Sequence, residues 1–268
     1  MRQYVSAKPF DGAGLLEVVG KDFRYFKNVL RLRVGDMVRV CEPGGSSVNS
    51  TLCALDERAK KIVLQRCDGM DGENQSDYSG RTEIWLFMFA PKPSRAEIIV
   101  RQATECGVFR IIPVQSDFSS SGSEKINFKS ERFSRIIKEA RQQSGSLVQT
   151  EVGECVSLER AVSLWRDETE KVGAESVFSA VLYERNEQSV TMRGAFNRKK
   201  KGPVKKACIA CGSEGGISPN EIAFLKASGF EIIHFDTNIL RCETACLYGI
   251  AVLQAELTEV EREENEQN

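Results

Sequence analysis

The chain has 268 residues, of which 41% are hydrophobic and 28% charged, and its formal net charge at pH 7 is -1. This length and hydrophobic share allow one large domain or two modest ones with a sizeable core, and they exclude a disordered chain. No apolar run approaches the roughly twenty residues of a membrane span, and the start lacks a hydrophobic signal region. We therefore expect a cytoplasmic protein.

Residues 1–70 are predicted to form a small β-domain, because short apolar strands (MVRVC, VNSTLCAL and KIVLQRC) alternate there with turns. Ahead of these strands, the segment 21–33 mixes cations with aromatic rings, as a site for RNA phosphates and bases does. Its candidates for RNA contact are Lys27, Arg31 and Arg33. A solvated edge of a small barrel is the alternative interpretation of this segment.

A polar, glycine-containing stretch without periodicity marks a domain boundary, and we predict a linker over residues 71–81. From residue 82, apolar runs of strand length alternate with segments of helical spacing. This βαβ pattern predicts an α/β domain over 82–258, followed by a disordered acidic tail over 259–268. The basic segment 193–206 is predicted to be a solvated loop, with an RNA contact as the alternative.

Nine scattered cysteines, an odd number, favour reduced thiols over a disulfide framework. Cys208 and Cys211 have the spacing of metal ligands. They lie in an apolar strand, however, where an offset of three residues sends side chains to opposite faces. We therefore predict no metal site.

Chemistry is most concentrated in the stretch 208–245, which begins with an apolar strand and the loop GSEGG. Gly212, Gly215 and Gly216 are expected to allow left-handed backbone angles and close approach of a ligand. The spacing is neither GxGxxG nor a P-loop, so dinucleotide and triphosphate sites lose support. A ligand loop and a purely structural turn both remain open on these residues alone.

A helix is predicted directly after this loop. Ser218 and Glu221 have the spacing of a capping box, and Pro219 between them suits the first helical position. Gly229 is expected to end the helix.

GSEGG with Glu221 downstream, followed by ILRCETA, resembles the signatures of the RsmE family of ribosomal RNA uridine-N3 methyltransferases, which belongs to the SPOUT superfamily. Further similarities extend the resemblance over nearly the whole chain. They are VLRLRVGD at 29–36, Lys92, ATECGV at 103–108, IIPVQSDFS at 111–119 and EARQQS at 139–144.

The resemblance implies a PUA-like RNA-binding β-barrel followed by a SPOUT-type α/β domain with a C-terminal trefoil knot, which ordinary fold rules would exclude. It also implies S-adenosyl-L-methionine as the cofactor, held by three loops. On this sequence the implied cofactor-binding residues are Leu182, Tyr183, Glu184, Cys211, Gly212, Ser213, Glu214, Gly215, Gly216, Phe235, Asn238, Ile239, Leu240 and Thr244.

The implied substrate is a uridine of 16S ribosomal RNA, within the assembled small subunit. Its N3 proton must leave, so a cation that favours the anionic base would help methyl transfer. Arg241 is the candidate for that role. Glu243 either orients Arg241 or caps the last helix, and Arg31 and Lys92 are implied RNA contacts. The single histidine, His234, is expected to be structural.

Several positions depart from the family pattern, in which a histidine precedes VLR, a proline follows the first glycine of the loop, and arginines stand at three further sites. Here Tyr25 replaces the histidine and Ser213 replaces the proline. The three arginines are replaced by Phe118, Ser146 and Asn238. An RNA-binding or cofactor-binding relative without efficient turnover, or with an altered substrate, is therefore the alternative to an active enzyme. A third hypothesis, an unrelated nucleotide-binding α/β enzyme, lacks a phosphate-binding motif.

The last helix is expected to be apolar on more than one side, with one stripe in the core and further apolar positions at Tyr248 and Val252. Core packing alone would suit this pattern. The resemblance implies in addition that the protein is a homodimer joined through this region.

Overall fold

The computed structural model describes residues 2–67, 81–119, 123, 126–185, 189–199 and 202–267. The chain divides into two compact units: unit 1 comprises 1–80 and 141–149, and unit 2 comprises 81–140 and 150–268. The domain predicted over 82–258 thus differs from unit 2 by the residues 141–149, which group with unit 1. Nearly all of the predicted linker, residues 71–80, lies outside the described part of the chain.

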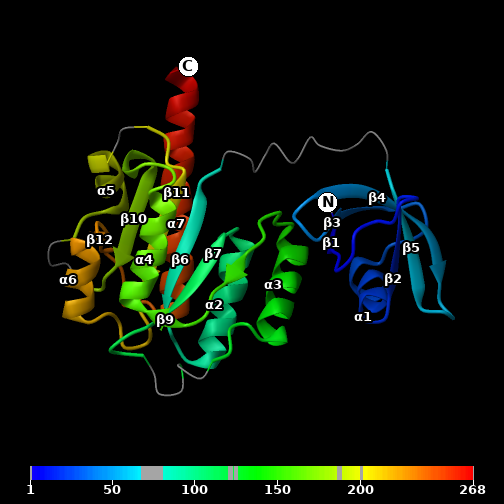
Figure 1. Cartoon of the computed structure of the whole chain (residues 1–268), viewed down its shortest axis with the longest axis horizontal. Coiled ribbons are helices and arrows are strands. Elements are labelled where there is room, and N and C mark those ends of the chain that lie inside the picture. The colour runs from blue at the N-terminus through cyan, green and yellow to red at the C-terminus, as the bar shows by residue number, and fades with distance from the viewer. Residues whose placement is uncertain are drawn as a thin grey trace. The chain divides into compact units, whose positions relative to one another are not determined.

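Unit 1 is built on a five-stranded sheet with the order β1-β3-β4-β5-β2 (Figure 1). The β1–β3 pair is parallel and the other pairs are antiparallel. The three strands predicted from apolar runs are present, whereas β1 and β2 were not anticipated. The strands are β1 (Gln3–Val5), β2 (Leu15–Val19), β3 (Met37–Cys41), β4 (Ser47–Asp56) and β5 (Lys61–Arg66).

The basic segment of unit 1 is helical rather than extended. Helix α1 (Lys21–Arg24) continues into the π-helix η1 (Tyr25–Leu30). Phe23 and Phe26 from these helices are buried in the unit's apolar core. Arg31 ends η1 with a left-handed φ of 51°.

Unit 2 contains a seven-stranded sheet in which neighbouring strands pair in parallel. Its order is β12-β10-β11-β6-β7-β8, with β9 also paired to β7. Strands covered on both faces need continuous apolar runs, which explains why they were predictable. The strands are β6 (Glu83–Phe89), β7 (Arg110–Gln115), β8 (Glu151–Val152), β9 (Val156–Ser157), β10 (Val177–Leu182), β11 (Lys206–Cys211) and β12 (Glu231–Ile233).

Helices cover both faces of this sheet (Figure 1). One apolar cluster contains residues of α2 (Pro93–Glu105), α3 (Glu131–Ser144), α5 (Met192–Lys199) and α7 (Cys242–Gln267), and a second contains residues of α4 (Leu158–Thr169) and α6 (Pro219–Ala227). A short 3-10 turn, η3 (Ala174–Ser176), precedes β10. Cys211 belongs to the first cluster and Cys208 to the second, so their side chains face opposite sides of β11, as predicted.

The predicted start of α6 is confirmed. Ser218 accepts a hydrogen bond from the backbone amide of Glu221, whose carboxylate in turn accepts from the amide of Ser218. Pro219 is the first helical residue, and Gly229 follows the helix with φ of 89°. This reciprocal cap fixes the entry to α6 directly after the glycine loop.

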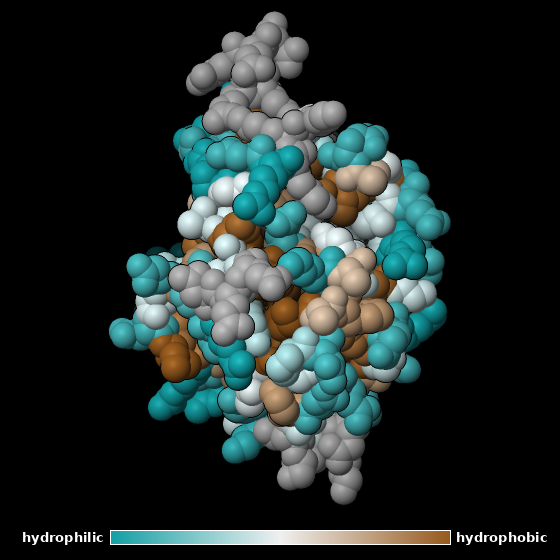
Figure 2. All heavy atoms as spheres, turned by 90° about the vertical axis from the view of Figure 1, so that its left-hand side faces the viewer, coloured by the Kyte–Doolittle hydropathy of each residue, from teal (hydrophilic) through white to brown (hydrophobic). Residues whose placement is uncertain are grey.

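Two predictions about basic and acidic segments are wrong. The first part of the segment predicted as a solvated loop over 193–206 is the helix α5, which buries Ala195 and Phe196. Helix α7 continues to Gln267, so the stretch predicted as a disordered tail is helical as far as that residue. Figure 2 views the face that carries α5 and α6, where apolar side chains gather in the middle, surrounded by hydrophilic ones.

Candidate functional site

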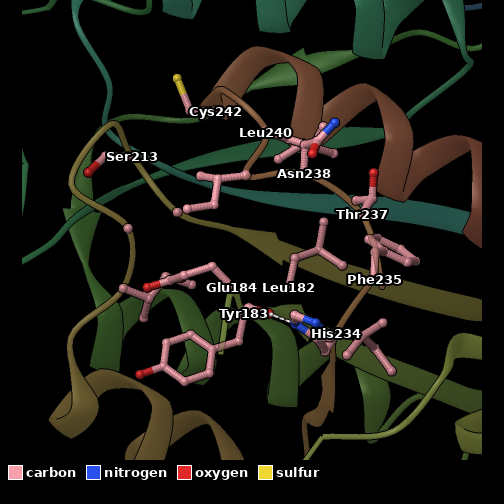
Figure 3. A pocket seen from close by; sticks show the side chains of 16 residues that line it. Leu182, Tyr183, Glu184, Ser213, His234, Phe235, Thr237, Asn238, Leu240 and Cys242 are labelled. Atoms are coloured by element: carbon pink, nitrogen blue, oxygen red, sulfur yellow. Dashed lines mark hydrogen bonds between the residues drawn. The ribbon is translucent and has the colours of Figure 1, made fainter. Parts of the chain in front are cut away.

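A pocket lies where the chain leaves β10, β11 and β12. Because these strands are neighbours in a parallel sheet, the segments after their carboxyl ends meet at one edge. The start of α7 completes the pocket (Figure 3). The lining residues are Leu182, Tyr183, Glu184, Gly212, Ser213, Gly216, Ile217, Ile233, His234, Phe235, Thr237, Asn238, Ile239, Leu240, Cys242 and Ala245.

The pocket encloses about 670 Å³ of empty space, a value that includes open solvent at its mouth. Apolar side chains form much of its wall, and Ile239 is 89% exposed. Glu184 and Asn238 contribute polar ends. Figure 3 shows the segments around Tyr183 and His234 side by side. Since a carbonyl oxygen only accepts, Nδ1 of His234 donates to the Tyr183 carbonyl at 3.2 Å.

The three loop glycines are required for different reasons. Only Gly216 has a left-handed φ, of 80°. A Cβ on Gly212 would lie 2.9 Å from the carbonyl carbon of Gly216, and a Cβ on Gly215 would lie 2.8 Å from the Cβ of Phe118. The expectation of left-handed angles at all three is therefore wrong for Gly212 and Gly215, where close approach of other parts of the chain excludes a side chain.

The glycine loop is bonded to the segment 116–119 that follows β7. The hydroxyl of Ser213 donates to the Phe118 carbonyl at 3.0 Å. The hydroxyl of Ser218 donates to the Asp117 carboxylate at 2.7 Å, and the amide of Asp117 donates to the Glu221 carboxylate at 3.1 Å. One bond thus joins the segment 116–119 to the glycine loop, and two bonds join it to the capping residues of α6.

Ten of the fourteen predicted cofactor residues line the pocket: Leu182, Tyr183, Glu184, Gly212, Ser213, Gly216, Phe235, Asn238, Ile239 and Leu240. Cys211, Glu214, Gly215 and Thr244 do not. The carboxylate of Glu214 accepts a hydrogen bond from the backbone amide of Lys92 at 3.1 Å. Lys92 and Thr244 are exposed, and Cys211 is buried.

The two predicted catalytic residues have different surroundings. Glu243 is 9% exposed, and its carboxylate accepts a hydrogen bond from Arg95 at 2.7 Å. Arg95, rather than Arg241, is therefore the cation paired with Glu243. Arg241 is exposed between the pocket-lining Leu240 and Cys242, and no ion pair of its side chain occurs among the described residues.

Cys242 is a lining residue whose thiol donates to the Glu243 carboxylate at 3.4 Å. Burial, with a smaller contribution from its hydrogen bond to Glu243, raises the pKa of this thiol to about 12. The group is therefore protonated near neutral pH, and it acts as a small apolar wall rather than as a nucleophile.

Six lining residues were not predicted: Ile217, Ile233, His234, Thr237, Cys242 and Ala245. Four of them, His234, Thr237, Cys242 and Ala245, each stand next in the sequence to a predicted site residue. Ile217 and Ile233 resemble ordinary core positions, and only the meeting of the strand ends reveals their role.

The RNA candidates of unit 1 lie on its surface. Lys27 forms an ion pair with Glu57 at 2.8 Å. Arg31 and Arg33 are exposed, and the backbone amide of Arg33 donates to Asp36. Arg31 and Arg33 can therefore bind an anion without breaking an ion pair among the described residues.

Within the described part of the chain, no three His, Cys, Asp or Glu side chains are grouped so as to hold a metal ion. No helix among the described residues combines the length and the apolar character that a membrane crossing needs.

The model of the RNA methyltransferase domain family matches residues 79–254. This span includes every residue that lines the pocket. The family match and the pocket therefore coincide in unit 2.

Two similar relatives match nearly the whole chain. Ribosomal RNA small subunit methyltransferase E 2 of Borreliella burgdorferi is 26% identical over 237 residues, covering 88% of each chain. Ribosomal RNA small subunit methyltransferase E of Bacillus subtilis is 24% identical over 260 residues, covering 93% of each.

The fold has solved counterparts. A ribosomal RNA small subunit methyltransferase E from Neisseria gonorrhoeae, crystallised with S-adenosyl methionine, superposes with a TM-score of 0.71 at 20% identity. The superposition covers 95% of this chain and 97% of that one. At this identity the likeness concerns the fold.

Proposed function

Because this chain belongs to the RNA methyltransferase domain family, we propose that it transfers a methyl group from S-adenosylmethionine to N3 of a uridine in 16S ribosomal RNA of the small subunit. The observation that carries the proposal is the pocket formed by three strand ends inside the family's span. The names of the two full-length relatives support the small subunit as the substrate.

The residues of the pocket fit the proposed cofactor. Adenine needs apolar walls, which Leu182, Ile239 and Leu240 supply, and ribose hydroxyls need an acceptor such as the Glu184 carboxylate. A Cβ on Gly216 would lie 3.4 Å from that carboxylate. The glycine therefore leaves the space beside Glu184 open to a ligand. When bound, the cofactor supplies an activated methyl group.

The chain's own contribution to the reaction is electrostatic. Loss of the N3 proton leaves negative charge on the uracil, and a fixed cation at the pocket mouth stabilises that charge. Arg241 is exposed between two pocket-lining residues and carries this role in our proposal. No ion pair among the described residues neutralises the charge of Arg241.

Glu243 is proposed as a positioning residue. Its ion pair with Arg95 ties the first turn of α7 to the first turn of α2, which holds the neighbouring Arg241 in place. A carboxylate in the first turn also favours the helix electrostatically. Lys92, whose amide binds the glycine loop through Glu214, is proposed to contact an RNA phosphate.

The proposal is tested by incubating purified small ribosomal subunits with the protein and methyl-labelled S-adenosylmethionine under single-turnover conditions. Label should appear in the RNA, and digestion should release it as N3-methyluridine. Binding of the cofactor without transfer would instead favour a binding relative without turnover. Label on another base or on a ribose would contradict the proposed chemistry.

We further propose that the protein acts as a homodimer in the cytoplasm, joined through α7. Tyr248 is 43% exposed and contacts Phe235, a pocket residue, with ring centroids 4.9 Å apart. A large ring left exposed beside the pocket suits burial by a second copy. Light scattering at micromolar concentration should give twice the chain mass, and Tyr248→Glu should lower it. A monomeric wild type would contradict this.

A C-terminal trefoil knot in unit 2 and a PUA-like barrel in unit 1 are also proposed. Two observations support the knot. Strand β12 pairs with β10 although β11 and α6 lie between them in the sequence, and the superposition covers nearly the whole chain. Pulling the chain by its ends should leave it shorter than its full contour length. Extension to the full contour would exclude a knot.

A further inference from the structure

An exposed aromatic ring stands beside the proposed methyl-transfer pocket. Phe118 is 46% exposed. Its Cβ and Cγ would lie 2.8 and 3.5 Å from a Cβ on Gly215. The base of the ring therefore packs directly on the glycine loop, one residue away from the pocket-lining Gly216.

The position of Phe118 is fixed from both sides. Its carbonyl accepts from Ser213, its amide donates to the hydroxyl of Ser116 at 3.3 Å, and the preceding Asp117 is bonded to both capping residues of α6. Ser213 in turn lines the pocket. Hydrogen bonds thus anchor the backbone of Phe118, while nearly half of the residue's surface is open to solvent.

The backbone of a lysine is bonded to the same loop. Lys92 is exposed, and its amide binds Glu214, the residue before Gly215. Consecutive residues of the glycine loop thus hold a lysine and an aromatic ring. Sites for single-stranded nucleic acid combine cations that bind the backbone with rings on which bases stack.

We propose that Phe118 is a substrate-binding residue that stacks on a base of the RNA strand whose uridine enters the pocket. The inference rests on the proposed function and adds a substrate contact to it. Stacking fixes the strand while the target base is presented to the methyl donor. An aromatic side chain tolerates any base, so Phe118 sets the register of the strand rather than its sequence.

Four full-length variants test the proposal. Phe118→Ala and Phe118→Leu should both raise the KM for small ribosomal subunits about five- to a hundredfold, the effect of one lost base stack. Cofactor affinity and melting temperature should be unchanged, and Phe118→Tyr should behave as wild type. The matched control is Phe224→Ala, a ring 37% exposed on α6 that does not line the cofactor pocket.

A second measurement does not depend on methyl transfer. Trp85 and Trp165 are 1% and 4% exposed, so in Phe118→Trp the new indole is the tryptophan that RNA can reach among the described residues. Small subunits or single-stranded RNA should quench its fluorescence. If RNA quenches Phe118→Trp but the wild-type protein does not methylate RNA, the proposed activity is contradicted and the stacking contact is supported. Wild-type KM in Phe118→Ala or Phe118→Leu, or no quenching by bound RNA, would overturn the stacking proposal.

Discussion

The guanidinium of Arg95 donates a 2.7 Å hydrogen bond to the carboxylate of Glu243, and these residues stand 148 positions apart. The bond joins the first turns of two helices that pack against each other, α2 and α7. Because Glu243 is 9% exposed, loss of its partner leaves a charge with poor access to water.

Replacing Glu243 with glutamine should lower stability. The pair contributes about 1–2 kcal/mol, since Arg95 is partly exposed and solvent screens it, so the melting temperature should fall by roughly 2–8 °C. Glu243→Gln combined with Arg95→Met should melt close to Glu243→Gln alone, because the two residues act together. Fully additive losses would show that the pair is not a unit.

Arg241→Ala should separate transfer from cofactor binding. We expect the single-turnover rate to fall about 100- to 1000-fold, as removal of one group that stabilises developing negative charge does. Affinity for S-adenosylmethionine should change less than about threefold, because backbone and apolar contacts dominate the proposed cofactor site.

Arg241→Lys should restore the rate only in part, since it keeps the charge but loses the planar donor fork. The matched control is Arg166→Ala, an exposed arginine in the last turn of α4. Helix α4 begins near the carboxyl ends of the strands, where the pocket lies, and its last turn is at the opposite end of the strands. A wild-type rate in Arg241→Ala would make Arg241 structural.

Gly212→Ala should weaken cofactor binding at least tenfold. The added Cβ would lie 2.9 Å from the backbone of Gly216 and 3.0 Å from Ile217, so the pocket wall must shift. Gly12→Ala is the control, because a Cβ there meets nothing within 4 Å. Calorimetry on folded proteins measures both affinities, and equal values for the two variants would place the cofactor elsewhere.

RNA binding by the full chain should weaken with salt, because unit 1 neutralises phosphates in our account. Arg31→Ala and Arg33→Ala should each lower the slope of log K against log salt by about one. Lys27→Ala should lower it less, because Lys27 already pairs with Glu57 at 2.8 Å. Unchanged slopes in both arginine variants would move the RNA site out of unit 1.

Local signals in the sequence predicted local structure well. The capping box of Ser218 and Glu221 needs partners only three residues apart, and the strand 83–89 is a continuous apolar run because both of its faces are covered. Helix α5 was missed for the opposite reason. Its basic flanks dominate the composition, while its structural signal is the burial of Ala195 and Phe196.

Long-range relationships could not be predicted from spacing. Gly215 was assigned to ligand approach, yet the atom nearest to its missing side chain belongs to Phe118, 97 positions earlier. Likewise, the partner of Glu243 is Arg95, which no motif contains. Similarity to a family located ten pocket residues, but only packed coordinates reveal which side chains hold the glycine loop in place.

The central claim is that this chain methylates N3 of a uridine in small-subunit ribosomal RNA. Primer extension and mass spectrometry of that RNA, from cells with and without the gene, test it most directly, since a methyl group on N3 blocks base pairing. One uridine should stop primer extension and carry a methyl group only when the gene is present. In cells that lack the gene, the wild-type gene should restore this methylation, and the Arg241→Ala gene should not. Identical methylation in both cells would contradict the account.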